Sequence, residues 1–138
     1  MQYILDRANT KDIDILDRIH TENMEKYVEA IYPWNPTLFR NNFIAKDYQV
    51  IKYQNEIIGF IKVVVSENSI YLGEIQIASN YQNRGIGTNI IENIIATKLN
   101  NQRLWLRVIK GNPAEKLYIR LGFTVFEEFL THKKLEIK

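Results

Sequence analysis

The sequence predicts a mixed α/β fold in a single domain that spans residues 1–138. Residues 48–53, 57–65 and 70–78 are rich in apolar and β-branched side chains, and two short polar turns separate them, which predicts a three-stranded antiparallel meander. Between residues 86 and 99, apolar side chains recur at a period of about 3.6, which indicates a helix. Patterns typical of a strand, a helix and closing strands then follow one another to the C-terminus.

The segments before the meander predict one strand and several helices. Residues 3–5 form a short apolar strand, and residues 11–20 carry apolar side chains at helical spacing with Asp12 as the expected N-cap. A second helical stretch covers residues 21–31 and stops before Pro33, because the residue preceding a proline disfavours helical geometry. Residues 38–45 predict another short helix.

The segments after the long helix predict a strand, a capped helix and a closing segment. Residues 103–109 alternate as a strand does. Asn112 then offers an N-cap, Pro113 a first helical residue and Glu115 a carboxylate in the first turn. Gly122 is placed to end this helix, and residues 123–137 supply one or two closing strands.

Composition excludes several classes of function. A net charge of +2 is too small for the concentrated basic stripe expected of a nucleic-acid-binding protein. The absence of cysteine excludes disulfides, thiolate metal sites and cysteine nucleophiles, and the two histidines lack the spacing of metal ligands. No apolar run approaches the roughly 20 residues that span a bilayer, and the first residues lack the apolar core of a signal peptide. We therefore expect a cytoplasmic protein without a metal.

The loop between the third meander strand and the long helix has the features of an anion site. Free amides and the partial positive charge at a helix N-terminus attract anions. Gly85 and Gly87 would let a phosphate approach the backbone, Arg84 adds a charged donor, and Thr88 adds a hydroxyl. A Walker loop would need lysine after its second glycine, and a dinucleotide-binding fingerprint would need a third glycine. From the loop alone, a glycine pair that serves only packing is as good an interpretation.

The surroundings of the loop resemble a known family. Ile75-Gln76-Ile77 followed by residues 81–87 is similar to the Gln/Arg-x-x-Gly-x-Gly/Ala signature of the GCN5-related N-acetyltransferases (GNAT). Residues 112–118 and 121–123 resemble the second signature of that family, so the resemblance covers residues 70–126. Asn83 departs from it, since the family often has glycine there, but asparagine tolerates left-handed backbone geometry.

This resemblance implies a GNAT acyl-CoA fold, in which the central strands splay apart and two helices flank the CoA site. It implies acetyl-CoA as co-substrate, with its pyrophosphate bound by Gln82, Asn83, Arg84, Gly85, Ile86, Gly87 and Thr88. The backbone of Ile75, Gln76 and Ile77 would pair with the pantetheine arm, and Asn112 would contact the ligand from the next helix.

The resemblance also implies the catalytic residues. Tyr118 matches the family tyrosine that protonates the leaving thiolate, and the amide of Ile77 would polarise the carbonyl. Glu74 is the candidate base, acting directly or through water; because strand parity points it away from Ile77, a solvated carboxylate is the alternative. His20 and His132 have no supporting pattern, and we expect both at the surface.

The acceptor pocket of this family is built largely by the first helices and the turn between them. Tyr27, Tyr32 and Trp34 are the aromatic candidates there, suited to a cationic amine, although such rings can equally cover a sheet edge. We expect direct acetyl transfer to a primary amine of a small molecule, peptide or protein, by a monomer or homodimer. A non-catalytic acyl-CoA-binding or sensing domain is the alternative.

Overall fold

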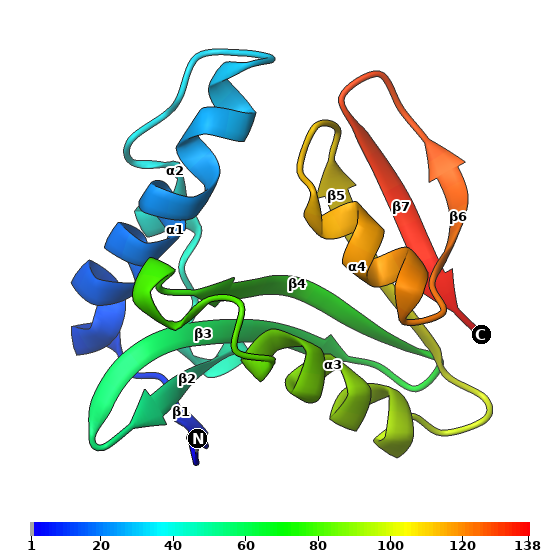
Figure 1. Cartoon of the computed structure of the whole chain (residues 1–138), viewed down its shortest axis with the longest axis horizontal. Coiled ribbons are helices and arrows are strands. Elements are labelled where there is room, and N and C mark those ends of the chain that lie inside the picture. Colours follow the sequence, from blue (N-terminus) through cyan, green and yellow to red (C-terminus); the bar gives the residue numbers. More distant parts are fainter. Residues whose placement is uncertain (1) are drawn as a thin grey trace.

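A computed structural model describes residues 2–138 and shows a seven-stranded mixed sheet with helices on both faces (Figure 1). The strand order is β1-β2-β3-β4-β5-β7-β6. The strands are β1 (Ile4–Arg7), β2 (Tyr48–Tyr53), β3 (Glu56–Val65), β4 (Ser69–Ile77), β5 (Arg103–Ile109), β6 (Thr124–Glu128) and β7 (His132–Ile137). The α-helices are α1 (Ile13–Glu29), α2 (Leu38–Asn42), α3 (Ile86–Thr97) and α4 (Ala114–Arg120). The predicted mixed α/β class and the antiparallel meander of β2, β3 and β4 are confirmed.

The central strands β4 and β5 run parallel and then separate. They pair only where residues 69–72 lie beside residues 103–106, although β4 continues to Ile77 and β5 to Ile109. Along β4 the separation begins at a β-bulge, because Lys62 pairs with Glu74 and Val63 pairs with Leu72, which leaves Gly73 unmatched. The predicted splay of the central strands is therefore present.

Helices α1 and α2 cover one face of the sheet. Leu16 and Ile19 of α1 and Phe39 of α2 pack against Val50 and Phe60 of the meander. Because side chains alternate along a strand, the neighbours of Val50 and Phe60 point to the other face. The bulge at Gly73 shifts the alternation along β4 by one residue. Glu74 and Gln76 therefore pair with Lys62 and Phe60 and face α1.

Helices α3 and α4 cover the opposite face. Ile86 and Ile90 of α3 pack with Ile51 and Ile61 of the meander. Farther along the sheet, the buried cluster joins side chains of α3, β4, β5, α4 and the segments after it: Ile91, Ile70, Leu72, Leu104, Leu106, Val108, Tyr118, Phe123 and Leu135. The sheet thus has a separate apolar core on each side.

The structure corrects several predicted boundaries. The two expected N-terminal helices are one continuous helix, α1, because nothing between His20 and Thr21 interrupts its hydrogen bonding. Asp12 makes no side-chain cap of α1; instead Asn9 and Asp12 form a capping box around the short 3-10 turn at Thr10–Asp12. The helix expected at residues 38–45 ends at Asn42, and the closing segment forms two strands.

Within residues 2–138, none of the helices has the length and apolar character that would carry it across a bilayer.

Candidate active site

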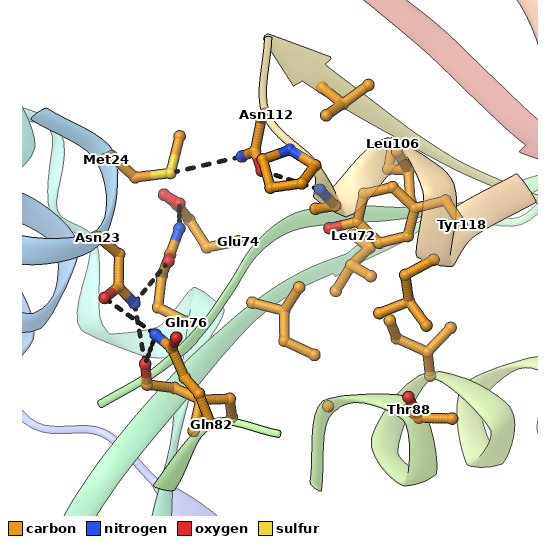
Figure 2. A pocket seen from close by; sticks show the side chains of 18 of the residues that line it. Asn23, Met24, Leu72, Glu74, Gln76, Gln82, Thr88, Leu106, Asn112 and Tyr118 are labelled. Atoms are coloured by element: carbon orange, nitrogen blue, oxygen red, sulfur yellow. Dashed lines mark hydrogen bonds between the residues drawn. The ribbon is translucent and has the colours of Figure 1, made fainter. Parts of the chain in front are cut away.

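A cleft of about 860 Å³ lies where β4 and β5 diverge. The second half of β4, the loop before α3 and the first turn of α3 form one wall. The end of β5 and the start of α4 form the opposite wall, and residues 22–27 of α1 approach from the other face of the sheet. Figure 2 shows the cleft between Asn23, Glu74 and Gln76 on one side and Thr88 and Tyr118 on the other.

The backbone of β4 presents free peptide groups to this cleft. The Ala78 N–H donates to the Ile58 carbonyl at 2.8 Å. In an antiparallel pair the residues that bond to the neighbouring strand alternate, so Gln76 also bonds to β3 while Ile75 and Ile77 point their peptide groups the other way. That direction leads to β5, which has already separated from β4. The amides of Ile75 and Ile77 are therefore available to a ligand in the cleft.

Two side-chain amides hold the end of β4 in place. Asn23 Nδ2 and Gln82 Nε2 both donate to the Ile77 carbonyl oxygen at 2.9 Å, and Gln82 also donates to Asn23 Oδ1 at 3.2 Å. Gln82 was expected to bind the cofactor; its side chain instead connects the loop to α1 and β4 by hydrogen bonds. The backbone of Gln76 bonds to β3, and its side chain forms hydrogen bonds with Asn23 and Glu74.

The loop before α3 places bare amides at the helix N-terminus. Asn83 (φ 62°) and Gly85 (φ 83°) are both left-handed, as expected for an asparagine that replaces glycine in this turn. The first bond of α3 runs from the Asn89 N–H to the Gly85 carbonyl. The N–H groups of Ile86, Gly87 and Thr88 therefore have no acceptor within the helix.

Packing alone does not require glycine at residue 87. A Cβ added to Gly87 would lie 3.8 Å from Ile75 Cδ1, an ordinary contact, and one added to Gly85 would meet nothing within 4 Å. Gly85 is needed for its left-handed backbone, whereas at Gly87 the missing side chain leaves open space beside the free amides. Gly85, Gly87 and Thr88 line the cleft, but Arg84 lies over the ring of Tyr81, 5.2 Å from its centroid, and does not.

Asn112 and Tyr118 come from the far wall. Asn112 Oδ1 accepts a hydrogen bond from the N–H of Ala114, the first residue of α4, at 2.9 Å, and its Nδ2 lies 3.9 Å from Met24 Sδ across the cleft (Figure 2). Tyr118 is buried with its ring edge-on to Phe123, and its hydroxyl has no hydrogen-bond partner within residues 2–138. Burial, and then the charge of Glu74, raise the pKa of Tyr118 to about 12.

The raised pKa of Tyr118 predicts a loss of stability at alkaline pH. An unfolded tyrosine ionises near pH 10, whereas folded Tyr118 keeps its proton to about pH 12, so the folded state binds more protons over that range. The stabilisation is complete below pH 10 and lost as the pH rises through 12, on the order of 2 to 3 kcal/mol. Denaturant unfolding at pH 8 and pH 11.5 should show a smaller loss for Tyr118→Phe than for wild type. Tyr32→Phe, at a half-exposed ring, is the control; equal losses in all three proteins would contradict the assignment.

Glu74 is held from two sides on the face that α1 covers. Its Oε2 lies 3.4 Å from His20 Nε2, and its Oε1 accepts from Gln76 Nε2 at 3.1 Å. Asn23 Nδ2 in turn donates to Gln76 Oε1 at 3.1 Å. Glu74 lines the cleft and is only 18 % exposed. Its neighbours therefore hold it in position, which contradicts the alternative of a freely solvated carboxylate.

The expectation of a surface histidine is wrong for His20. Its side chain is 19 % exposed, its ring stacks on Phe39 with centroids 4.7 Å apart, and Trp34 lies 5.7 Å away. Its Nδ1 is buried without a partner among residues 2–138. Because Nε2 faces Glu74, it is the ring nitrogen that can donate to the carboxylate.

The three aromatic residues expected in the acceptor pocket are not brought together. Tyr27 lines the cleft, with Lys26 Nζ 5.0 Å from the centre of its ring. Tyr32 is half exposed and Trp34 packs beside His20, and neither lines the cleft. Sequence reasoning missed Asn23 and Met24, which do line it; their positions about one turn before Tyr27 on α1 carry no local signature.

The site fits an extended ligand with an anionic end. The free amides of α3 suit a phosphate, and the free edge of β4 suits a chain of amides such as pantetheine. No group of three histidine or acidic side chains lies close enough to hold a metal ion in residues 2–138.

Comparisons with known proteins agree with this geometry. A family model described as an acetyltransferase (GNAT) domain matches residues 41–125, whereas none of the curated proteins matches the chain. Among solved structures, the PaiA N-acetyltransferase of Thermoplasma acidophilum in complex with coenzyme A is similar, at 17 % identity and a TM-score of 0.75, over 100 % of this chain and 99 % of that one.

Two further solved structures show the same fold. Arabidopsis thaliana Naa50, in complex with the bisubstrate analogue CoA-Ac-MVNAL, is 17 % identical with a TM-score of 0.71, over 100 % of this chain and 99 % of its own. The ribosomal-protein-S18-alanine N-acetyltransferase of Escherichia coli is 20 % identical with a TM-score of 0.68, over 98 % and 91 % of the two chains. The splayed strands and the bare N-terminus of α3 agree with this fold, and the family model, which matches more than half of the chain, shows that the chain belongs to the GNAT family of acetyltransferases.

Proposed function

We propose that this protein moves an acetyl group from acetyl-CoA directly to a primary amine of a small molecule, peptide or protein. The observation that carries the proposal is the placement of two groups on opposite sides of one cleft. Glu74 approaches from the face covered by α1 and Tyr118 from the face covered by α4, near enough for the charge of Glu74 to raise the pKa of Tyr118. A carboxylate for the amine and a phenol for the leaving sulfur thus lie beside the free amides of β4.

Glu74 prepares the amine. An alkylamine has a pKa near 10.4 and is mostly protonated at neutral pH, so it must lose a proton before it attacks. Glu74 accepts that proton directly or through one water. His20 and Gln76 hold the carboxylate in one orientation, and its place on the α1 side supports an acceptor that binds on that side of the cleft.

The amide of Ile77 and the hydroxyl of Tyr118 stabilise the charge that develops during transfer. The Ile77 N–H donates to the carbonyl oxygen as the C–N bond forms. Tyr118 donates to the sulfur as the C–S bond breaks. A phenol with a pKa of about 12 holds its proton more tightly than a thiol with a pKa of about 8.5. In place of the proton transfer expected from the sequence, we therefore propose that Tyr118 acts as a hydrogen-bond donor that keeps its proton.

The proton balance follows. The ammonium gives up two protons in forming the amide; one ends on the thiol of coenzyme A and one leaves to solvent through Glu74. The missing cysteine agrees with this direct transfer in a ternary complex, which gains its rate from holding both substrates in line.

The experiment that tests this function follows thiol release from acetyl-CoA across a panel of amines. The panel holds polyamines, amino acids, lysine-containing peptides and peptides with free N-termini, each matched with its N-blocked form as the control. We expect thiol release with at least one free amine. The product should be about 42 Da heavier than that amine, because an acetyl group replaces a hydrogen. Tight acetyl-CoA binding without thiol release from any amine would favour the sensing alternative.

A further inference from the structure

A second cavity, of about 400 Å³, lies on the sheet beyond α1 and α2, the helices that cover the N-terminal strands. It is lined by Tyr71, Trp105, Arg107, Phe129, His132 and Lys134. Tyr71 faces away from α3 and α4, because its neighbours Ile70 and Leu72 belong to the core on their side. Helix α1 contacts β3 and β4, and β5, β6 and β7 extend past it (Figure 1).

The walls of this cavity combine aromatic rings with cations. Tyr71 and Trp105 stack with their ring centroids 4.2 Å apart, and Lys134 Nζ lies 5.6 Å from the centre of the Trp105 ring. Lys134 also pairs with Glu127 at 3.3 Å at the rim. No aspartate or glutamate is among the lining residues, so the cavity has a positive lining.

Arg107 is the cation of this cavity that has no acidic partner within residues 2–138. Its Nη2 lies 3.1 Å from His132 Nε2. A guanidinium can only donate, so Nε2 accepts, and His132 Nδ1 donates to Thr131 Oγ1 at 3.1 Å. Partial burial first, and then Arg107 and Lys134, lower the pKa of His132, which is therefore neutral near pH 7. The neutral ring orients Arg107 without cancelling its charge.

Arg107 connects this cavity with the active-site cleft. Of the six residues that line the second cavity, it is the one that also lines the cleft. Tyr71 provides a second link, because the charges of both Arg107 and Glu74 act on its phenol. The cavity therefore continues the side of the cleft on which Glu74 receives the amine.

We propose that this second cavity is an acceptor subsite in which Arg107 binds a carboxylate carried by the amine substrate. The inference rests on the proposed function, since it places the amine at Glu74. A planar carboxylate can take two parallel N–H donors of a guanidinium, and the carbon chain that joins it to the amine would lie on the stacked rings of Tyr71 and Trp105. Acceptors that carry a carboxylate at the right distance are then preferred over their uncharged amides.

The test compares ω-amino acids of four to eight carbons with the corresponding ω-amino amides as acceptors. Wild type should show a ratio of kcat/KM for acid over amide of roughly tenfold or more at one chain length, and that length measures the span from Glu74 to Arg107. Arg107→Gln should bring the ratio to about one, and Arg107→Lys should keep part of it. Lys110→Gln is the matched control, because it removes one charge just after the same strand. Among residues 2–138 the Lys110 side chain forms an ion pair with exposed Glu128 alone, and it lines neither cavity.

Peptides with glutamate or glutamine at their second to fourth residue form a parallel arm, which tells whether the carboxylate belongs to a peptide or to a small molecule. A preference for acids in either arm that Arg107→Gln removes supports the subsite. A ratio near one in wild type in both arms, or a preference unchanged in Arg107→Gln, overturns it.

A binding measurement separates this inference from the proposed function. Calorimetric titration of the ω-amino acids and amides into the protein with coenzyme A needs no turnover. Tighter binding of the acids that Arg107→Gln abolishes would support the subsite even if no amine were acetylated. Equal binding of acids and amides would overturn it even if acetylation were observed.

Discussion

Replacing Gly85 with glutamate should weaken acetyl-CoA binding by at least roughly 100-fold, because a carboxylate would then stand where the pyrophosphate meets the N-terminus of α3. Two like charges about 4 Å apart at a protein surface repel by roughly 4 kcal/mol, and each 1.4 kcal/mol is a factor of ten in Kd. Calorimetric titration with acetyl-CoA measures the effect directly.

The same substitution should leave the fold intact. A Cβ added at Gly85 meets nothing within 4 Å, and the φ of 83° costs a non-glycine residue roughly 1 kcal/mol. A negative charge at a helix N-terminus offsets part of that cost. Gly85→Asn is the matched control, since asparagine accepts left-handed geometry and adds no charge. Comparable weakening in both variants would point to the backbone rather than to charge, and unchanged binding in Gly85→Glu would remove this loop as the pyrophosphate site.

The backbone geometry of the expected donor side was predictable because its residues are neighbours in sequence. Residues 83–88 form one turn and the start of one helix, and the local rules for glycine, asparagine and helix termini apply to them directly. Asn83 and Gly85 accordingly have the left-handed backbone that the loop required. The meander and the helix α3 were predictable for the same reason, since alternation and helical periodicity act over a few residues.

The acceptor side was less predictable because it is assembled from residues far apart in the chain. His20 reaches Glu74 across 54 positions, and Asn23 reaches Ile77 across a similar span. No spacing rule connects such residues; their contact depends on how α1 crosses the sheet. The bulge at Gly73 was equally hidden, yet it decides that Glu74 faces α1. Arg107 was also not predictable from local sequence, because its proposed role depends on its position between the two cavities that it lines.

Replacing Tyr118 with phenylalanine should lower kcat by roughly 100-fold while changing the KM for acetyl-CoA little, because the lost hydroxyl acts on the leaving sulfur and not on the ground state. The hydroxyl has no hydrogen-bond partner within residues 2–138, so its removal leaves no buried group unpaired. The melting temperature at pH 8 should therefore stay close to that of wild type. Tyr53→Phe, on a ring that packs on Tyr81 and does not line the cleft, is the matched control.

The pH dependence of the same pair of proteins distinguishes a hydrogen-bond donor from a titrating acid. With a pKa of about 12, Tyr118 stays protonated throughout the range in which the enzyme is assayed, so kcat of the wild type should show no loss between pH 8 and pH 10 that Tyr118→Phe removes. A tyrosine with the ordinary pKa near 10 would already be half ionised at the upper limit. Single-turnover measurements keep product release out of the comparison. An alkaline limb centred near pH 10 that disappears in Tyr118→Phe would contradict the donor role. An unaltered kcat in that variant would exclude Tyr118 from the chemistry. Glu74 and the amide of Ile77 would then remain as the groups proposed to act on the reacting atoms.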